Sequence, residues 1–99
     1  MASLRKTEVL RKIYNVHNKT EINLIVLSVY HNLIATAAFD NKVAIYDYEF
    51  GRLLAKIELE KSTFASGLNF IEGYSLLVVA TESKHVYLVD ISNKDYISV

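Results

Sequence analysis

Two stretches of this chain align with each other without a gap at an offset of 43 residues. Residues 33–48 lie over residues 76–91, and the identical pairs are Leu33 and Leu76, Ala37 and Ala80, Val43 and Val86, and Asp47 and Asp90. Several further pairs match in character rather than in identity, among them Ile34 with Leu77 and Ile45 with Leu88. This internal repeat predicts two copies of one structural unit, and it therefore constrains the fold more than any other feature of the sequence.

Each copy is predicted to consist of short antiparallel strands, because its apolar segments are rich in Ile, Leu, Val and Tyr and are separated by turn signals. The predicted strands are residues 22–29, 33–38, 42–48 and 53–59 in the first copy, and 64–71, 76–82 and 86–91 in the second, with 96–99 beginning a fourth. Residues 53–61 and 6–14 could equally form short amphipathic helices.

The turn residues predict how these strands connect. Asp40 and Asn41 are expected to form a two-residue hairpin turn, because both residue types tolerate positive φ, and Gly51 supplies the same freedom in the next turn. The first three strands are apolar nearly throughout, as expected for sheets covered on both faces. Residues 55–60 alternate between apolar and charged, so the fourth strand is expected to be the exposed outer one.

The size and charge of the chain favour a single soluble unit over residues 1–99. It has 99 residues, 52% hydrophobic content, a formal net charge of zero and no cysteine. Neutral charge argues against nucleic acid or an anionic membrane as the main partner, and no apolar run approaches the roughly 20 residues that span a bilayer. We expect an intracellular, cytoplasmic protein that meets other proteins and does not bind membranes.

Residues 34–47 resemble the core signature of the WD-repeat family, and residues 49–52 resemble the turn that follows it in that family. The resemblance implies an all-β fold of antiparallel four-stranded meander blades from a β-propeller, here a partial propeller or fragment. The family's hydrogen-bonded tetrad maps onto His17, Thr36, Asp40 and Tyr46, with Tyr46 in place of tryptophan. Such a network would fasten the loop of a blade to its sheet, and Tyr46 is expected to be buried with its hydroxyl hydrogen-bonded.

The second copy resembles a degenerate blade. Val79, Ser83 and Val89 stand at the positions of Thr36, Asp40 and Tyr46, and the shared feature is the repeat aspartate, Asp47 in one copy and Asp90 in the other. The resemblance implies that residues 9–14 are the outer strand of a preceding blade, 17–59 a complete blade and 60–99 a second, incomplete one.

No pattern in the sequence supports catalysis, a cofactor or a bound metal. His17, Thr36 and Asp40 are the residue types of a nucleophilic triad, but no strand-to-helix elbow accompanies them. His31 and His85 lack a second histidine or carboxylate at metal-ligand spacing, and the glycines do not form a phosphate-binding loop. We expect a protein that is not an enzyme.

The function predicted from these observations is a non-catalytic protein–protein interaction scaffold. Phe39 is the candidate contact residue, because it precedes the turn at Asp40, on the rim where partner contacts are common in the family. Self-association or continuation into further blades is expected to cover the end faces.

Two alternatives stay open: a nucleic-acid-associated module that uses the basic cluster from Arg5 to Lys12, and a free-standing β-sandwich binding domain.

Overall fold

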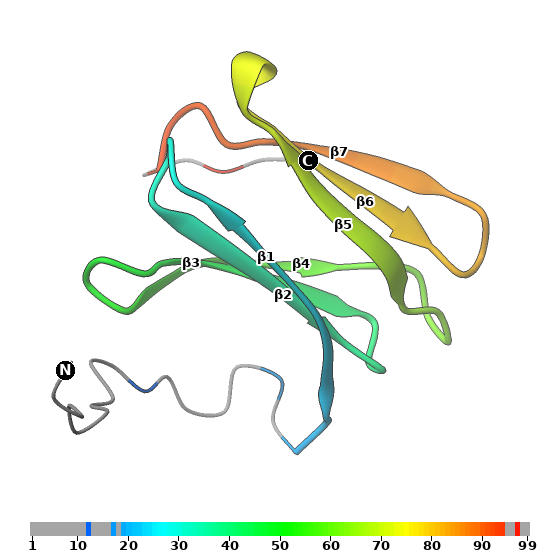
Figure 1. The fold of residues 1–99 in the computed structure, drawn as a ribbon. Helices are drawn as coiled ribbons and strands as arrows, with labels where there is room; N and C mark the ends of the chain where they lie inside the picture. The colour runs from blue at the N-terminus through cyan, green and yellow to red at the C-terminus, as the bar shows by residue number, and fades with distance from the viewer. Residues whose placement is uncertain (1–11, 13–16, 18, 95–96, 98–99) are drawn as a thin grey trace, which may run out of the picture.

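The first repeat folds into a four-stranded antiparallel sheet. The computed structural model describes residues 12, 17, 19–94 and 97 of the chain. Strands β1 (Ile22–Ser28), β2 (Leu33–Ala38), β3 (Lys42–Asp47) and β4 (Arg52–Glu58) follow one another in a meander of order β1-β2-β3-β4 (Figure 1). The strand interpretation of residues 53–59 is confirmed and the helical one is wrong, since β4 pairs along its length with β3. As expected, β4 is an outer strand and its side chains are mostly exposed.

The second repeat forms a three-stranded antiparallel sheet of order β5-β6-β7. Its strands are β5 (Ala65–Ile71), β6 (Leu76–Thr81) and β7 (Val86–Asp90), and the short 3₁₀ helix η1 (Glu72–Tyr74) joins the first two. The all-β prediction is confirmed for the described residues. Of the predicted outer strand 9–14, only Lys12 lies among those residues, and of the segment 96–99 only Ile97 does; neither belongs to a strand.

The two copies of the repeat also share irregularities of the backbone. Strand pairing shifts register between Ile22 and Leu24 in the first sheet, and between the equivalent residues Ala65 and Gly67 in the second. Asn32 and its equivalent Ser75 both have positive φ, at 57° and 52°, just before the second strand of each sheet. The two sheets are therefore copies of one backbone design.

The predicted hairpin at Asp40 and Asn41 is wrong in its detail. Three residues, 39–41, connect β2 to β3, and neither Asp40 nor Asn41 has positive φ. The turn is made instead by the side chain of Asp40, whose Oδ1 accepts a hydrogen bond from the backbone N–H of Lys42 at 3.1 Å. Gly51 does adopt the left-handed conformation expected of it, with φ at 70°.

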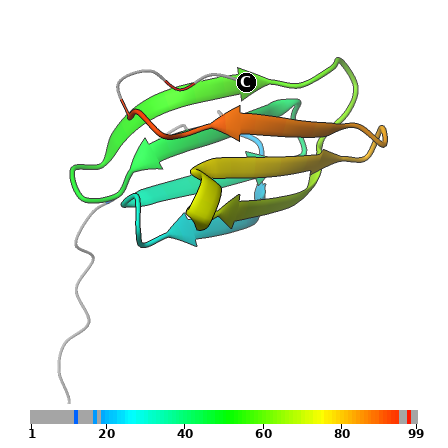
Figure 2. The same ribbon diagram turned by 90° about the horizontal axis from the view of Figure 1, so that it is seen from above.

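The core lies between the two sheets, which pack face to face (Figure 2). We name the two sides of each sheet by their residues. The leading face carries Leu33, Ala35, Val43 and Ile45 in the first sheet and their equivalents Leu76, Val78, Val86 and Leu88 in the second. The trailing face carries Ile34, Thr36, Ala44 and Tyr46 in the first sheet and their equivalents Leu77, Val79, Tyr87 and Val89 in the second.

Each sheet contributes a different one of these faces to the core. Leu33, Ala35, Val43 and Ile45 of the first leading face are fully buried against Leu77, Val79 and Val89 of the second trailing face. Leucine, isoleucine and valine side chains buried in this way contribute about 1.5–3 kcal/mol each. Strands β1 and β5 lie alongside each other at the junction of the two layers (Figure 1).

The expectation that the first three strands are covered on both faces is confirmed for β2 and β3, but it is wrong for β1, and the strands of the second sheet do not follow it either. Val86 and Leu88 on the second leading face are exposed, although their equivalents Val43 and Ile45 are buried. In β1, Ile25 and Leu27 are exposed on the first trailing face. Each sheet thus has one apolar face inside the core and one that is at least partly open.

No helix of the described residues is long and apolar enough to cross a membrane.

Replacing Leu77 by Ala is expected to lower the free energy of unfolding by about 2–5 kcal/mol, because it leaves a cavity in the core between the sheets. The matched control is Leu88→Ala, which shortens a leucine that is 55% exposed on the opposite face and should change stability little. Urea melts of the two variants measure the difference, and equal losses would contradict the assignment of faces.

Candidate functional site

Three of the four predicted tetrad residues meet on the trailing face of the first sheet. His17 is buried, its Nδ1 lies 3.0 Å from Oδ2 of Asp40, and its Nε2 lies 2.9 Å from Oγ1 of Thr36. A carboxylate only accepts hydrogen bonds, so Nδ1 carries the proton that binds Asp40. In the neutral imidazole, Nε2 then accepts from the hydroxyl of Thr36.

Tyr46, the fourth member, lies beside this group. Its side chain is buried, as expected from the sequence, and its phenol lies near enough to the Thr36 side chain for Thr36 to influence its pKa. Burial raises the pKa of the Tyr46 phenol, and the contact with Thr36 acts in the opposite direction but is smaller. Thr36 is therefore the shared partner of His17 and Tyr46.

This arrangement cannot act as a nucleophilic triad. The order of hydroxyl, imidazole and carboxylate is that of a hydrolase, but the Thr36 side chain is 0% exposed. A nucleophile must reach a substrate, and this hydroxyl is enclosed by its own sheet and by His17. The network is structural: it supplies hydrogen-bond partners to polar groups that would otherwise be buried without them.

The same network holds the loop from Phe39 to Asn41 in place. Asp40 binds His17 with one carboxylate oxygen and the backbone of Lys42 with the other. On the other side, the Asn41 side chain donates to the Leu59 carbonyl at 3.2 Å, and the Leu59 N–H donates to the Asn41 carbonyl at 2.7 Å. The loop is thus tied both to the segment before β1 and to the segment after β4.

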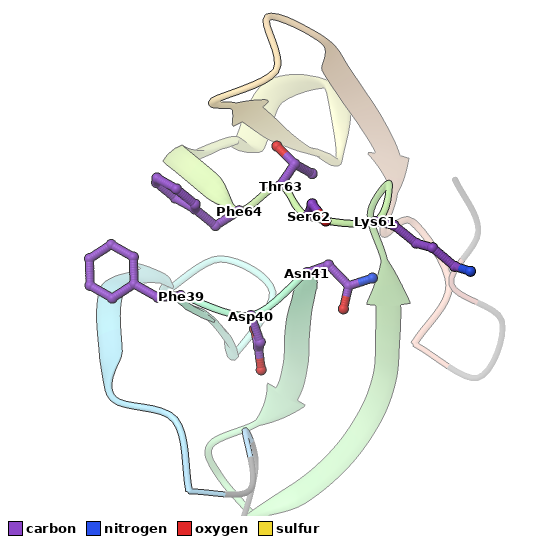
Figure 3. A pocket seen from close by; sticks show the side chains of 7 residues that line it. All are labelled: Phe39, Asp40, Asn41, Lys61, Ser62, Thr63 and Phe64. Atoms are coloured by element: carbon purple, nitrogen blue, oxygen red, sulfur yellow. The ribbon is translucent and has the colours of Figure 1, made fainter.

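Phe39 stands on this anchored loop beside an open hollow of about 550 Å³ between the ends of the two sheets. Its ring is 60% exposed and meets the ring of Phe64 edge to face, with centroids 5.2 Å apart and planes at 73°. The hollow is lined by Phe39, Asp40, Asn41, Lys61, Ser62, Thr63 and Phe64. Figure 3 shows the two aromatic rings on the same side of the hollow, while Lys61 extends away from them.

Phe64 and Lys61 were not among the residues singled out from the sequence. Phe64 is equivalent to Glu21 in the other copy, so the repeat gives no signal for an aromatic pair. The two phenylalanines come together only because the sheets pack face to face, which places the β2–β3 loop next to the β4–β5 connection. The candidate docking site is therefore a property of the seam between the repeats.

The second repeat has a different cluster where the first has the histidine network. Ser83, the equivalent of Asp40, shares a hydrogen bond of 3.0 Å with the Thr81 hydroxyl, and exposed His85 forms an ion pair with Glu60. In the turn between β6 and β7, Lys84 adopts a positive φ of 72°, whereas the equivalent turn of the first repeat is stabilised by the Asp40 carboxylate. As the sequence predicted, no equivalent of the His17 contacts forms here among the described residues.

A second polar cluster ties the sheets together at the opposite end. The buried hydroxyl of Ser28 donates to Glu72 at 2.8 Å and lies 3.1 Å from His31 Nδ1, and His31 Nε2 lies 3.0 Å from the hydroxyl of Ser75. The interpretation of His31 as a histidine satisfied by protein partners fits these contacts. The contacts of Ser28 with Glu72 and of His31 with Ser75 could not be found from sequence, because each joins residues 44 positions apart.

The two repeat aspartates occupy equivalent positions with different surroundings. Burial alone would raise the pKa of Asp47, but hydrogen bonds from Lys94 and from the backbone of Phe50 and Glu49 outweigh it, so that the pKa is below its usual value. Lys94 belongs to the second repeat and approaches Asp47 Oδ2 to 3.3 Å. Asp90 is exposed, and hydrogen bonds from Ser92 lower its pKa.

Among the residues that the structure describes, no group of three or more His, Cys, Asp or Glu side chains could hold a metal ion. The comparisons with known proteins add no relative: no family model, no curated protein and no solved structure matches this chain. The interpretation of the site therefore depends on its own geometry.

Asp40→Ala is expected to lower the free energy of unfolding by about 1–3 kcal/mol, because the buried His17 ring and the Lys42 N–H lose their acceptor. Ser83→Ala, the equivalent change in the second repeat, should cost much less, since Ser83 bonds only to its own turn. Denaturant melts compare the two variants, and equal losses would show that the His17 network does not stabilise the first sheet.

Asp47→Asn should remove part of the acid sensitivity of the protein. A carboxyl group with a lowered folded-state pKa adds stability above its unfolded-state pKa of about 3.9, and that stability is lost as pH falls through the folded-state value. The wild type should be more stable than Asp47→Asn near neutral pH, with the gap closing as pH falls below about 4. A gap that stays constant from neutral to acid pH in urea melts would contradict the ionic role of Asp47.

Proposed function

We propose that this chain is a non-catalytic protein–protein interaction module made of WD-repeat-like propeller blades, and that it binds its partner through Phe39 and the hollow beside it. The proposal rests mainly on the observation that Phe39 is exposed although Asp40 and Asn41 beside it are held by hydrogen bonds and its ring packs against Phe64. Exposed aromatic side chains in well-packed surroundings are the usual centres of protein interfaces.

The rigidity of the loop supports this proposal. A side chain that must be ordered on binding loses rotamer and backbone entropy, and that loss reduces affinity. Asp40 and Asn41 already hold the Phe39 backbone, and Phe64 already holds one edge of its ring. The aromatic surface is therefore preorganised for contact.

The packing of the sheets supports a blade arrangement over a closed β-sandwich. Two copies of one unit that close on each other around a two-fold axis bury the same face of each copy. Here the first sheet buries its leading face and the second its trailing face, which is the relation between successive blades of a ring or other repeating array. This relation favours the propeller interpretation.

Nothing in the part of the chain that the structure describes favours the nucleic-acid alternative. Of the basic cluster from Arg5 to Lys12, only Lys12 lies among the described residues. The formal net charge of the chain is zero, so a general electrostatic attraction to phosphate backbones is absent. Binding of the chain to a heparin column at moderate salt would support this alternative.

Phe39→Ala should reduce binding of cellular partners by about tenfold or more, as expected for loss of a central aromatic contact. The measurement is quantitative affinity enrichment from cell extract with immobilised wild-type and variant chains. The matched control is Phe50→Ala, which removes another phenylalanine, 69% exposed, from the β3–β4 turn at the other end of the sheet.

Partners that bind Phe50→Ala like the wild type and are lost with Phe39→Ala would support the proposal. Unchanged melting of both variants shows that the loss does not come from unfolding. Binding that survives Phe39→Ala, or that falls equally in both variants, would rule out the Phe39 surface as the docking site.

A further inference from the structure

We propose that Ser75 is a reactive nucleophile, activated by His31, that takes up the acyl group of an activated aryl ester. The two residues lie at the end of the seam opposite Phe39, so this chemistry goes beyond the docking role proposed above. A side chain that is acylated in this way is a modification site, and it is compatible with a non-catalytic docking module.

The hydrogen bonds around His31 assign the proton on its ring. Ser28 has a single hydroxyl proton, which it donates to Oε1 of Glu72 at 2.8 Å, because a carboxylate only accepts. The Ser28 oxygen therefore accepts from Nδ1 of His31, which lies 3.1 Å away. In the neutral imidazole Nε2 then carries no proton, and it accepts from the Ser75 hydroxyl at 3.0 Å. Neutral His31 thus presents to Ser75 the nitrogen that can take up its proton.

A buried hydroxyl holds the imidazole in this orientation. Ser28 is 0% exposed, and its oxygen also accepts a hydrogen bond from the backbone N–H of His31 at 3.2 Å. Nucleophile, imidazole, hydroxyl and carboxylate are thus joined in one chain of hydrogen bonds, in which each group orients the next. A base that is itself oriented by a third group is the arrangement that activates a serine.

The backbone of Ser75 is fixed in an unfavourable conformation. Its φ and ψ are 52° and 49°, a left-handed conformation that asparagine, present as Asn32 at the equivalent position, adopts more readily than serine. The N–H of Ser75 donates to the Glu72 carbonyl at 3.2 Å, and its carbonyl accepts from the N–H of Ile91 at 3.0 Å. Backbone strain of this kind is concentrated at functional sites.

The surroundings of Ser75 favour an aryl ester as the acyl donor. Ser75 and His31 are both half-buried, unlike the enclosed Thr36, so that a small molecule can approach them. Each is next in the chain to an exposed tyrosine, Tyr74 beside Ser75 and Tyr30 beside His31. The Tyr30 ring meets the His31 ring edge to face, with centroids 4.9 Å apart. Exposed rings of this kind can pack against a flat aromatic leaving group.

The proposed step transfers the acyl group from the ester oxygen to the Ser75 oxygen. The Ser75 oxygen attacks the ester carbonyl carbon, and its proton passes to Nε2 of His31. The bond between the carbonyl carbon and the leaving oxygen then breaks, and the leaving aryloxide takes the proton from His31. The products are an O-acyl serine and a phenol, and His31 is neutral again.

Neither of the other two histidines forms an equivalent pair among the described residues. His17 contacts Thr36, but that hydroxyl is 0% exposed and cannot reach an ester. The Ser83 hydroxyl lies 3.5 Å from Nδ1 of His85, and the same nitrogen forms an ion pair with Glu60. A nitrogen that donates to a carboxylate cannot take a proton from serine. Ser83 is half-buried like Ser75, and it is therefore the matched control.

The test exposes the folded chain briefly to p-nitrophenyl acetate and locates the acetyl groups by mass spectrometry. The tryptic peptide 62–84 carries Ser75 and three further serines: Ser62, Ser66 and Ser83. Ser62 and Ser66 are more exposed than Ser75, so accessibility alone would favour them. We expect acetylation of Ser75 to be the fastest of the four, and urea that unfolds the chain should abolish the preference.

His31→Gln should slow acetylation of Ser75 by about a hundredfold or more, as expected for loss of a general base. Ser83→Ala should leave the rate at Ser75 unchanged. Ser28→Ala should also slow the reaction, whereas Ser28→Thr, which keeps the hydroxyl, should slow it less. Melting curves show which variants are folded.

Two outcomes would overturn the proposal. One is acetylation that is no faster at Ser75 than at the other serines of the folded wild type, a comparison that depends on no variant. The other is an unchanged rate at Ser75 in folded His31→Gln. Phe39→Ala should be acetylated like the wild type, so that this proposal and the Phe39 docking proposal fail independently.

Discussion

The packing of one leading face on one trailing face is the contact on which the rest of this structure depends. Each of these antiparallel sheets has an apolar face that must be buried against another element. Leu33, Val43 and Ile45 on one side and Leu77 and Val89 on the other supply that burial. The seam between the sheets, its hollow at one end and its polar cluster at the other all exist because these two faces meet.

The polar networks fix geometry rather than supply the main driving force. A hydrogen bond in a folded protein contributes only about 0.5–1.5 kcal/mol net, but a buried group that loses its partner costs more. His17, Thr36 and Asp40 therefore specify one conformation of the loop that carries Phe39. The second repeat lacks this network and forms its turn with Lys84 in a left-handed conformation, so the two copies reach a similar backbone by different local means.

The sequence predicted the strands and the contacts inside one repeat well, because those depend on local periodicity and on a repeated pattern. Strand β4 was recognisable by its alternation, and the grouping of His17, Thr36 and Asp40 followed from the family resemblance. Contacts between the repeats were not predictable: Phe39 with Phe64, His31 with Ser75 and Asp47 with Lys94 depend on how two sheets are oriented, and no local pattern encodes that orientation. The turn at Asp40 was predicted wrongly. Asp40 and Asn41 both tolerate positive φ, but the turn is stabilised by a hydrogen bond to the Asp40 side chain and neither residue has positive φ.

The two sheets are in contact at both ends of their seam, by the rings of Phe39 and Phe64 near the hollow and by His31 with Ser75 at the far end. Ties at opposite ends resist sliding and rotation of one layer over the other, so the distance and angle between the Phe39 rim and the Leu88 face are set by the fold. A partner bound at Phe39 would therefore be held at a fixed distance and angle from both sheets. In mechanical terms, a pull on that partner would be carried by both sheets together and not by the loop of Phe39 alone.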